Sequence, residues 1–355
     1  MNAPGSNPKP NRFSLPSALA LIVGSALLWL SLGQLSGQPE QVASAGAASV
    51  TPVAGPVHAL KVTVLSTMLT DAAGVGEWGF SALVEVEGKR LLFDTGGRPN
   101  TVLNNARELG IDLSGVEDVI LSHNHWDHVT GLVTLRRELS KANPNALCRA
   151  HVGRGIFLER LIPPGAMGAG KMTMAEVKSG YEALGGKFIE YAEPKALFPG
   201  VWLTGPVPRP YPEKNYPAGI HLRDPSGKLL EDNVPEDQSL VLDSDKGLVV
   251  LTGCGHAGLI NTLTYARQTA RPAAQVYAAL GGFHLFAAKV DTLAWTADKL
   301  KSFGVAQPLG AHCTGIEPVY YFRECLGLER QACVVGAVGE SFDLAQGIHA
   351  GNIAQ

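Results

Sequence analysis

The stretch LSHNHWDHVTG, residues 121–131, constrains this chain more than any other. It places His123, His125, Asp127 and His128 within six positions, although the 355 residues contain only 10 histidines. The apolar run DVILS just before it is typical of a short buried strand. Sites in α/β folds lie beyond the carboxyl ends of strands. Because imidazole and carboxylate groups suit zinc and related divalent ions, we predict a metal site rather than a polar surface turn.

Later histidines occur in similar surroundings. His256 lies in VVLTGCGHAG, His284 in AALGGFHLF and His312 in LGAHCTG, so each follows a short apolar run and stands near glycines. Glycine lets the backbone approach a site closely. We therefore expect these three histidines to converge on the first cluster. His151, at the end of ALCRAH, is a weaker candidate for a residue behind the ligands or beside the substrate.

Strand and helix patterns alternate along most of the chain, which indicates an α/β fold. Residues 81–96 predict a β-hairpin that turns at Glu87 and Gly88. The other segments with clear periodicity are strands at 60–66, 117–123, 239–253 and 275–282, and helices at 101–110, 131–139, 260–268 and 292–304. The proline-rich segment 205–219 is either a lid or binding loop, or a surface excursion.

The N-terminal segment has a different composition. No charged residue occurs from Phe13 to Pro39, and Lys9 and Arg12 precede this stretch. About 20 apolar residues suffice for a helix to span a bilayer, with the positive flank in the cytoplasm. We expect an apolar helix that is either a cleaved signal peptide or an uncleaved membrane anchor.

These features predict the organisation of the chain. The expected segments are a cytoplasmic tail (1–12), an anchor or signal peptide (13–35), a flexible linker (36–59), a folded domain (60–345) and a tail (346–355). Both interpretations of the apolar helix export the domain. The protein would then be anchored in the inner membrane facing the periplasm, or secreted to the periplasm.

Composition excludes several classes of partner. The net charge is −3 and there is no long basic run, so we expect no nucleic-acid partner. GCGHAG, residues 253–258, matches the dinucleotide fingerprint, but no Asp or Glu occurs from Ala257 to Val290 to bind a ribose, so we expect no dinucleotide. Five cysteines are too few for a disulfide framework, and Cys325 with Cys333 is the nearest pair.

Taken together, these motifs resemble the metallo-β-lactamase superfamily. HNHWDH matches its signature and LLFDTGG its earlier aspartate loop. EWGFSALVEVEGKRLLFDTG, LTGCGHAGLINT, GGFHLF and HCTG resemble a subfamily of metal-dependent hydrolases and dihydropterin-6-yl-methyl-(ribofuranosyl)aminobenzene 5′-phosphate synthases. The resemblance covers about residues 60–345. It implies an αββα sandwich, in which two β-sheets pack face to face with helices outside.

The resemblance also implies a set of ligands for one or two divalent ions, zinc first, with manganese or iron as alternatives. The first ion would be held by His123, His125 and His256, and the second by Asp127, His128 and His312. Asp94 would orient a ligand. One departure stands out: family members commonly bridge the two ions with an aspartate between the two later histidines, where this chain has GGFH. His284 either replaces that ligand or contacts substrate.

The expected activity is hydrolysis of an ester, lactone, thioester or phosphoester by a metal-bound hydroxide. Asp127 and His284 are the predicted catalytic residues, with a small molecule as substrate. The alternatives are a transferase similar to the pterin and ribofuranosyl-aminobenzene-phosphate synthases, and a non-enzymatic metal-binding domain.

Overall fold

The computed structural model describes residues 55–354. The predicted tail (1–12), the apolar helix (13–35) and residues 36–54 of the linker (36–59) lie outside the described residues. Within residues 55–354, no helix is both long enough and apolar enough to cross a membrane.

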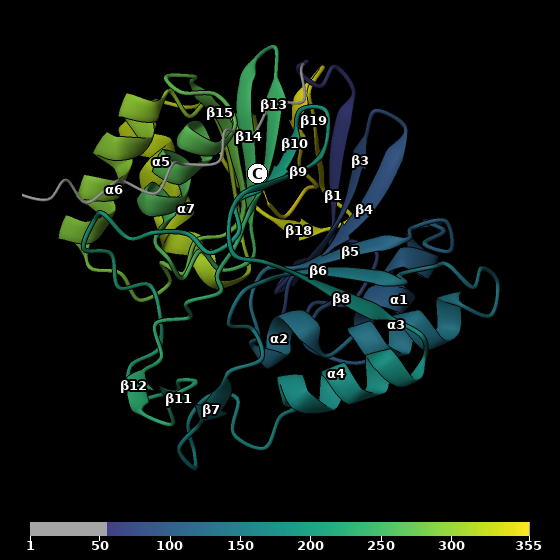
Figure 1. The fold of residues 1–355 in the computed structure, drawn as a ribbon. Helices are drawn as coiled ribbons and strands as arrows, with labels where there is room; N and C mark the ends of the chain where they lie inside the picture. Colours follow the sequence, from purple (N-terminus) through teal and green to yellow (C-terminus); the bar gives the residue numbers. More distant parts are fainter. Residues whose placement is uncertain (1–54, 355) are drawn as a thin grey trace, which may run out of the picture. The chain divides into compact units, whose positions relative to one another are not determined.

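Two β-sheets form the centre of the described part (Figure 1). The first has eight strands in the order β20-β19-β1-β3-β4-β5-β6-β8, and the second has seven in the order β17-β16-β15-β14-β13-β10-β9. The strands of the first sheet, in chain order, are β1 (Leu60–Ser66), β3 (Ser81–Val86), β4 (Lys89–Phe93), β5 (Asp118–Leu121), β6 (Arg149–Gly153), β8 (Lys187–Tyr191), β19 (Ser341–Asp343) and β20 (Gly347–His349). Those of the second are β9 (Lys195–Phe198), β10 (Val201–Leu203), β13 (Leu240–Ser244), β14 (Gly247–Thr252), β15 (Val276–Gly282), β16 (Gln307–Ala311) and β17 (Val334–Val335).

Helices cover the outer face of each sheet (Figure 1). The first sheet packs against α1 (Thr101–Glu108), α3 (Leu132–Leu139) and α4 (Met174–Ala183). The second packs against α5 (Leu259–Thr269), α6 (Val290–Phe303) and α7 (Ile316–Leu326). The predicted αββα sandwich is therefore present in residues 55–354.

The side chains of β3 show that both faces of the first sheet are buried. Ala82, Val84 and Val86 point into the core between the two sheets, while Leu83 points to the helices on the other side. Successive side chains of a strand point to opposite faces, so a strand covered on both sides reads as a continuous apolar run. The predicted hairpin is confirmed, because Val86 pairs with Lys89 and the two turn residues both have positive φ.

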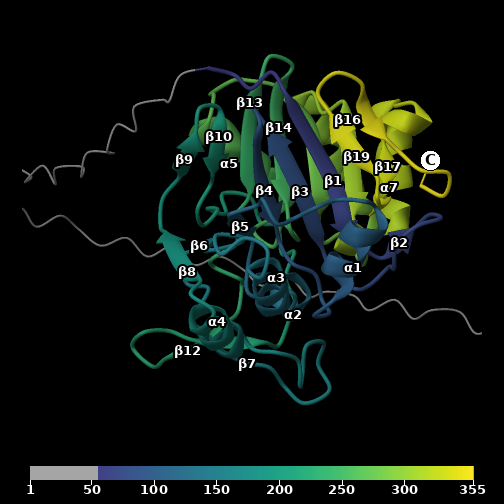
Figure 2. The same ribbon diagram turned by 90° about the vertical axis from the view of Figure 1, so that its right-hand side faces the viewer.

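Shorter elements complete the described part. Two small sheets are formed by β7 (Glu159–Leu161), β11 (His221–Arg223) and β12 (Leu229–Glu231), and by β2 (Leu69–Thr70) with β18 (Ala337–Val338). The helix α2 (Trp126–Val129) and the 3₁₀ turns η1 (His312–Thr314) and η2 (Arg330–Ala332) are single turns. In both views, β7 and β12 lie at the end of the molecule that carries α2 and α4 (Figures 1 and 2).

The domain boundaries differ from the prediction at both ends. Val57, assigned to the linker, is buried and its N–H donates to the carbonyl of Asp243 at 2.7 Å. At the other end, β20 lies inside the segment 346–355 that was predicted as a tail, and Ile348 contributes to the core between the sheets. The prediction missed β20 because three residues are too few to show a period.

Candidate metal centre

The candidate site lies where the strands of both sheets end. Asp94 follows β4, His123 follows β5, and His256 follows β14. His284 follows β15, and His312 opens η1 directly after β16. Because β4, β5 and β6 run parallel, as do β14, β15 and β16, their carboxyl ends meet at one edge of the sandwich.

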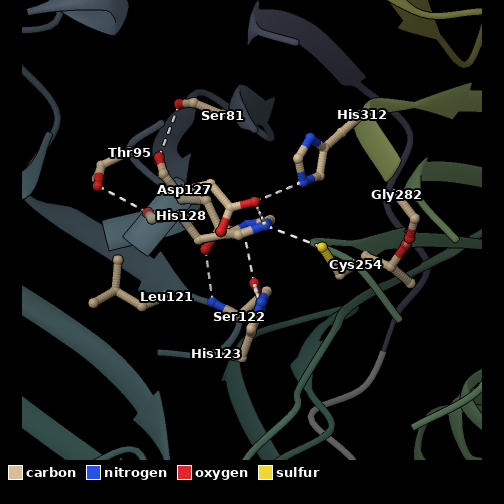
Figure 3. Close-up of polar contacts among 12 residues, drawn as sticks. Ser81, Thr95, Leu121, Ser122, His123, Asp127, His128, Cys254, Gly282 and His312 are labelled. Atoms are coloured by element: carbon tan, nitrogen blue, oxygen red, sulfur yellow. Dashed lines mark hydrogen bonds and ion pairs between the residues drawn. The ribbon is translucent and has the colours of Figure 1, made fainter. Parts of the chain in front are cut away.

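The histidine rings are close neighbours. The ring of His123 has its centroid 4.6 Å from that of His125, 4.2 Å from that of His128 and 4.6 Å from that of His256. The ring of His312 lies 5.0 Å from that of His128. Asp127 is also close, because its Oδ2 atom lies 3.2 Å from Nε2 of His312. The structure thus brings together all six predicted ligand residues. Figure 3 shows Asp127, His128 and His312 facing one another.

The short helix α2 determines the positions of the side chains of His125, Asp127 and His128. His125 has extended backbone angles and precedes the helix, and its carbonyl accepts the N–H of His128 at 3.0 Å. The helix therefore begins directly after His125. Asp127 and His128, in the first turn, project toward the same volume as His123.

Asp94 is a buried anchor for this arrangement. Its Oδ2 atom accepts hydrogen bonds from the Ser122 hydroxyl at 2.7 Å and from Nδ1 of His128 at 2.8 Å. Its Oδ1 atom accepts the backbone N–H of Ser122 at 2.7 Å. A carboxylate bound to one nitrogen of an imidazole fixes the ring and leaves the other nitrogen free to act as a ligand. These hydrogen bonds are the geometry that the predicted orienting role of Asp94 requires.

Gly253 allows the second sheet to approach this anchor. A Cβ atom at this position would lie 2.0 Å from the Ser122 hydroxyl and 2.6 Å from Oδ2 of Asp94. Only a residue without a side chain fits there. The glycine of GCGHAG therefore serves close packing of the two sheets at the site.

Burial keeps His123, His125 and His256 unprotonated. It lowers the pKa of His123 and of His256 well below their usual range, and neighbouring imidazoles add to the effect. Burial also lowers the pKa of His125 to about 4, against the opposing charge of Asp127. These rings are neutral at pH 7, and neutral imidazole is the form that binds a metal ion.

For His128 and Asp127, neighbouring charges outweigh the effect of burial on the pKa. Burial alone would lower the pKa of His128, but the carboxylates of Asp94 and Asp127 outweigh it and raise that pKa to about 9. Burial alone would raise the pKa of Asp127, but His128 and His312 hold it well below its usual range. The site therefore contains an ionised carboxylate beside a protonated imidazole, and His128 has to release its proton when a metal ion binds to it.

The unpartnered atoms fit a metal ion. Nε2 of His123 and Nε2 of His256 are buried and have no hydrogen-bond partner, whereas the other nitrogen of each ring is held by Ser122 and by the carbonyl of Asn215. Nδ1 of His312 is likewise buried without a partner. A buried polar atom without a partner is costly, and a bound ion would satisfy it. Nitrogen, oxygen and sulfur donors together suit zinc or a similar transition metal.

Two cysteines of the site were missed by the sequence analysis. The Sγ atom of Cys254 lies 3.1 Å from Nε2 of His128 and 3.2 Å from Sγ of Cys313. Both are buried, and all five cysteines of the chain are free thiols, including Cys325 and Cys333. The available signal was adjacency, because Cys254 stands two residues before His256 and Cys313 directly follows His312.

His284 and His151 differ in position. The ring of His284 lies 4.5 Å from that of His256 and lines the same cavity. His284 and His312 both have positive φ, a strained conformation for these residues that is common at functional sites. His151, in contrast, lies within β6, where its ring bonds to Asp118 at 2.8 Å and to the hydroxyl of Tyr191 at 3.0 Å.

The prediction of a site role for His151 was therefore wrong. Both of its ring nitrogens are engaged by residues of neighbouring strands, and it does not line the cavity. Sequence alone could not show that His151 sits in the middle of its strand rather than at the end.

A cavity of about 380 Å³ opens over the histidines. Its floor includes His125, Asp127, His256, His284 and His312. Most of the remaining wall is apolar and comes from α2, from residues 157–175 and from residues 217–220; it includes Trp126, Phe157, Ile162, Met167, Met172, Met174, Pro217 and Ile220.

The proline-rich segment 205–219 belongs to the site rather than to a surface excursion. The carbonyl of Asn215 accepts a hydrogen bond from Nδ1 of His256 at 2.5 Å. The carboxylate of Glu213 accepts the N–H groups of Ile260 at 3.2 Å and Asn261 at 2.8 Å, at the start of α5. Glu213 thus occupies the helix start where a dinucleotide fold would bind phosphate.

Comparison with known proteins agrees with this geometry. The sequence model of the metallo-β-lactamase superfamily matches residues 79–146, which include the histidine motif. A 7,8-dihydropterin-6-methyl-4-(β-D-ribofuranosyl)-aminobenzene-5′-phosphate synthase of Methanocaldococcus jannaschii is 31% identical over 270 residues, which cover 73% of this chain and 90% of that protein. An uncharacterised protein of the same organism is 31% identical over 67% of this chain and 84% of its own length.

A solved structure has the same fold. A metal-dependent hydrolase of the β-lactamase superfamily superimposes with a TM-score of 0.65 and 24% identity. The similarity covers 80% of this chain and 98% of that one. At this level of identity the likeness concerns the fold alone.

Proposed function

Because this chain belongs to the metallo-β-lactamase superfamily, we propose that it is a metal-dependent hydrolase of a small ester, lactone, thioester or phosphoester. One observation carries the proposal. Buried imidazole nitrogens without partners occur on His123, His256 and His312, and His256 and His312 line an open cavity. A purely structural metal site is closed by its ligands, whereas a catalytic site keeps a position open to substrate.

The residues that would hold the ions are His123, His125, Asp127, His128, His256 and His312. Such an ion, most favourably zinc, supplies electrophilic activation and makes water acidic enough to react near pH 7. Asp127 is positioned to orient the attacking water and to carry a proton, because it is ionised, buried and faces the cavity. His284, beside His256 in the cavity wall, is positioned to contact the leaving group.

The cavity wall indicates the type of substrate. Methionine and aromatic side chains make up much of it, and flexible methionines adapt to apolar groups of different shape. We therefore propose a substrate with an apolar or flat aromatic portion next to the hydrolysed bond.

The test is a panel of esters, lactones, thioesters and phosphoesters with short and long apolar groups, assayed on the full chain in mild detergent. Hydrolysis should vanish after chelation and return with zinc. His151→Gln is the matched control, because His151 lies in β6 away from the cavity and this variant should keep its turnover. Activity that survives complete removal of metal would exclude the proposal.

A synthase-like reaction is the second candidate. Its support is the name of the M. jannaschii relative, which covers most of this chain. Against it, the only Lys or Arg side chains that line the described cavity are Arg160 and Lys171. Arg160 is paired with Asp232 and Glu236 at 3.0 and 2.5 Å, and Lys171 lies over the ring of Trp126. Of these two lining residues, Lys171 alone is not ion-paired and could bind a phosphate group.

Incubation with a pterin and a phosphoribosyl donor discriminates between the two reactions. A metal-dependent product that contains both portions would favour the synthase. Consumption of simple esters or lactones without such a product favours the hydrolase.

The location of the protein is a separate proposal. We propose that the apolar segment 13–35 exports the domain, either as an anchor that leaves it facing the periplasm or as a cleaved signal peptide. A phosphatase reporter fused after residue 59 should be active if the segment exports it. N-terminal sequencing of the mature chain would then separate the anchor from the cleaved form.

A further inference from the structure

Cys254 has a position that no other donor of the site shares. Three groups of potential ligand atoms, each within 4.8 Å of one another, occur among the described residues. They are His123 with Cys254 and His256, His128 with Cys254 and His312, and Cys254 with His284 and Cys313. Cys254 is the one residue that belongs to all three groups.

We propose that the sulfur of Cys254 is a metal ligand shared by two ions, one bound by His123 and His256 and the other by His128 and His312. The site would then take thiophilic divalent ions, such as zinc, iron or cobalt. The inference depends on metal binding at this site but not on the reaction proposed above.

The neighbouring imidazoles support this assignment. Nδ1 of His128 is held by Asp94, so Nε2 is the atom left for an ion, and it lies 3.1 Å from the Cys254 sulfur. Nε2 of His123 and Nε2 of His256 are also buried and unpartnered, and both residues form one ligand group with Cys254. Cys254 itself is only 2% exposed. A sulfur enclosed by three imidazoles, rather than packed among apolar side chains, indicates a ligand.

Cys313 has a different role. Its sulfur belongs to one group only, with Cys254 and His284, and it lies 3.2 Å from the Cys254 sulfur. When an ion binds, the thiol proton of Cys254 leaves to solvent and the metal–sulfur bond forms.

Gly282, at the end of β15, cannot supply a shared ligand. A Cβ on Gly282 would lie 2.1 Å from the carbonyl oxygen of Gly253 and 3.0 Å from the Cys313 sulfur. No side chain can therefore enter the site from Gly282, and the sulfurs occupy that region. His284 belongs to neither of the two groups proposed to bind the ions, because it is grouped only with Cys254 and Cys313.

A shared sulfur predicts a preference among ions. Thiolate favours zinc, cobalt and iron, whereas magnesium, calcium and manganese favour oxygen ligands. The zinc preference expected from the sequence would then follow from Cys254 rather than from the histidines.

The experiment is X-ray absorption at the zinc edge on the full chain loaded with two equivalents of zinc. A zinc–sulfur distance of about 2.3 Å is distinct from zinc–nitrogen at about 2.0–2.1 Å. One sulfur shared by two ions gives about one sulfur neighbour per zinc, and one terminal sulfur gives about half. The parallel measurement is cobalt substitution, in which a thiolate ligand produces an intense near-ultraviolet charge-transfer band.

Three variants assign the sulfur. Cys254→Ser should lose the charge-transfer band and the zinc–sulfur signal, while Cys313→Ser and the exposed Cys325→Ser should keep both. The wild-type spectra need no variant, so they test the inference even if Cys254→Ser does not fold. Zinc bound by nitrogen and oxygen alone would overturn it, as would about half a sulfur per zinc, or a sulfur signal that is lost in Cys313→Ser but kept in Cys254→Ser. Zinc–sulfur bonds without hydrolysis of any substrate would refute the proposed reaction and leave this inference standing.

Discussion

Oδ2 of Asp94 lies 2.8 Å from Nδ1 of His128, and neither side chain is exposed to solvent. The two residues are 34 positions apart and come from the ends of β4 and the start of α2. The same oxygen accepts the hydroxyl of Ser122, which in turn lies 2.9 Å from Nδ1 of His123. One carboxylate thus orients two histidines that belong to different ligand groups.

Asp94→Asn should weaken zinc binding by about 10–100-fold, because the loss of a carboxylate behind a ligand histidine typically has this effect. Competition with a chelating dye on the full chain measures the affinity. The matched control is Asp118→Asn, which alters another aspartate–histidine pair, with His151 in the first sheet. Equal zinc affinity for Asp94→Asn and wild type would show that Asp94 does not support the metal centre.

Asp127→Asn should lower kcat by about 10²–10⁴-fold, the range typical of a lost proton-transfer group. The amide preserves the shape of the side chain but cannot accept a proton from water. Steady-state kinetics with the best substrate of the panel, together with circular dichroism, separates this loss from misfolding. Turnover equal to that of wild type would remove Asp127 from the mechanism.

Gly253→Ala should destabilise the protein by about 1–3 kcal/mol, the cost of forcing a methyl group into a packed region. The new Cβ would contact the side chains of Ser122 and Asp94, so zinc affinity should fall as well. Gly115→Ala is the control, because the nearest atom to a Cβ there is 4.0 Å away. Urea unfolding measures both variants. A Gly253→Ala variant as stable as Gly115→Ala would contradict the close approach of the two sheets.

The pair of Asp118 and His151 should make stability depend on acid. Burial alone would raise the pKa of Asp118, but hydrogen bonds from His151 and Arg149 outweigh it and hold that pKa well below its usual range. The unfolded chain then binds more protons than the folded chain as pH falls below about 4, so this stabilisation is present above that pH and is lost below it.

Asp118→Asn measures that contribution. At pH 7 the variant should be less stable than wild type by about 1–3 kcal/mol, and the difference should shrink as the pH falls toward 3. Urea unfolding at several pH values gives the two curves. A difference that stays constant with pH would show that Asp118 is not the titrating group.

The sequence was most informative where one short segment contains both the structural and the chemical pattern. The hairpin at Glu87 and Gly88, and the strand that delivers His123, are local features that the structure confirms. His256, His284 and His312 could be grouped because each ends an apolar run beside glycines, and parallel strands bring such ends to one edge.

Features that depend on contacts between distant segments could not be read in this way. His151 and His256 both follow apolar runs, but only the register of β6 against β5 and β8 shows that His151 faces Asp118 and Tyr191. The three-residue strand β20 has no period of its own and forms because β19 offers it an edge.

By itself the sequence predicted the α/β fold class and the cluster of histidines with Asp127, because strand periodicity and motif spacing are local properties of the chain. Only the tertiary structure decided that Cys254 stands among the imidazoles and that Gly253 lets the two sheets meet. The same holds for Asn215, which reaches His256 across 41 positions. These relationships arise when two sheets pack together, and a shared position in space leaves no spacing pattern in the sequence.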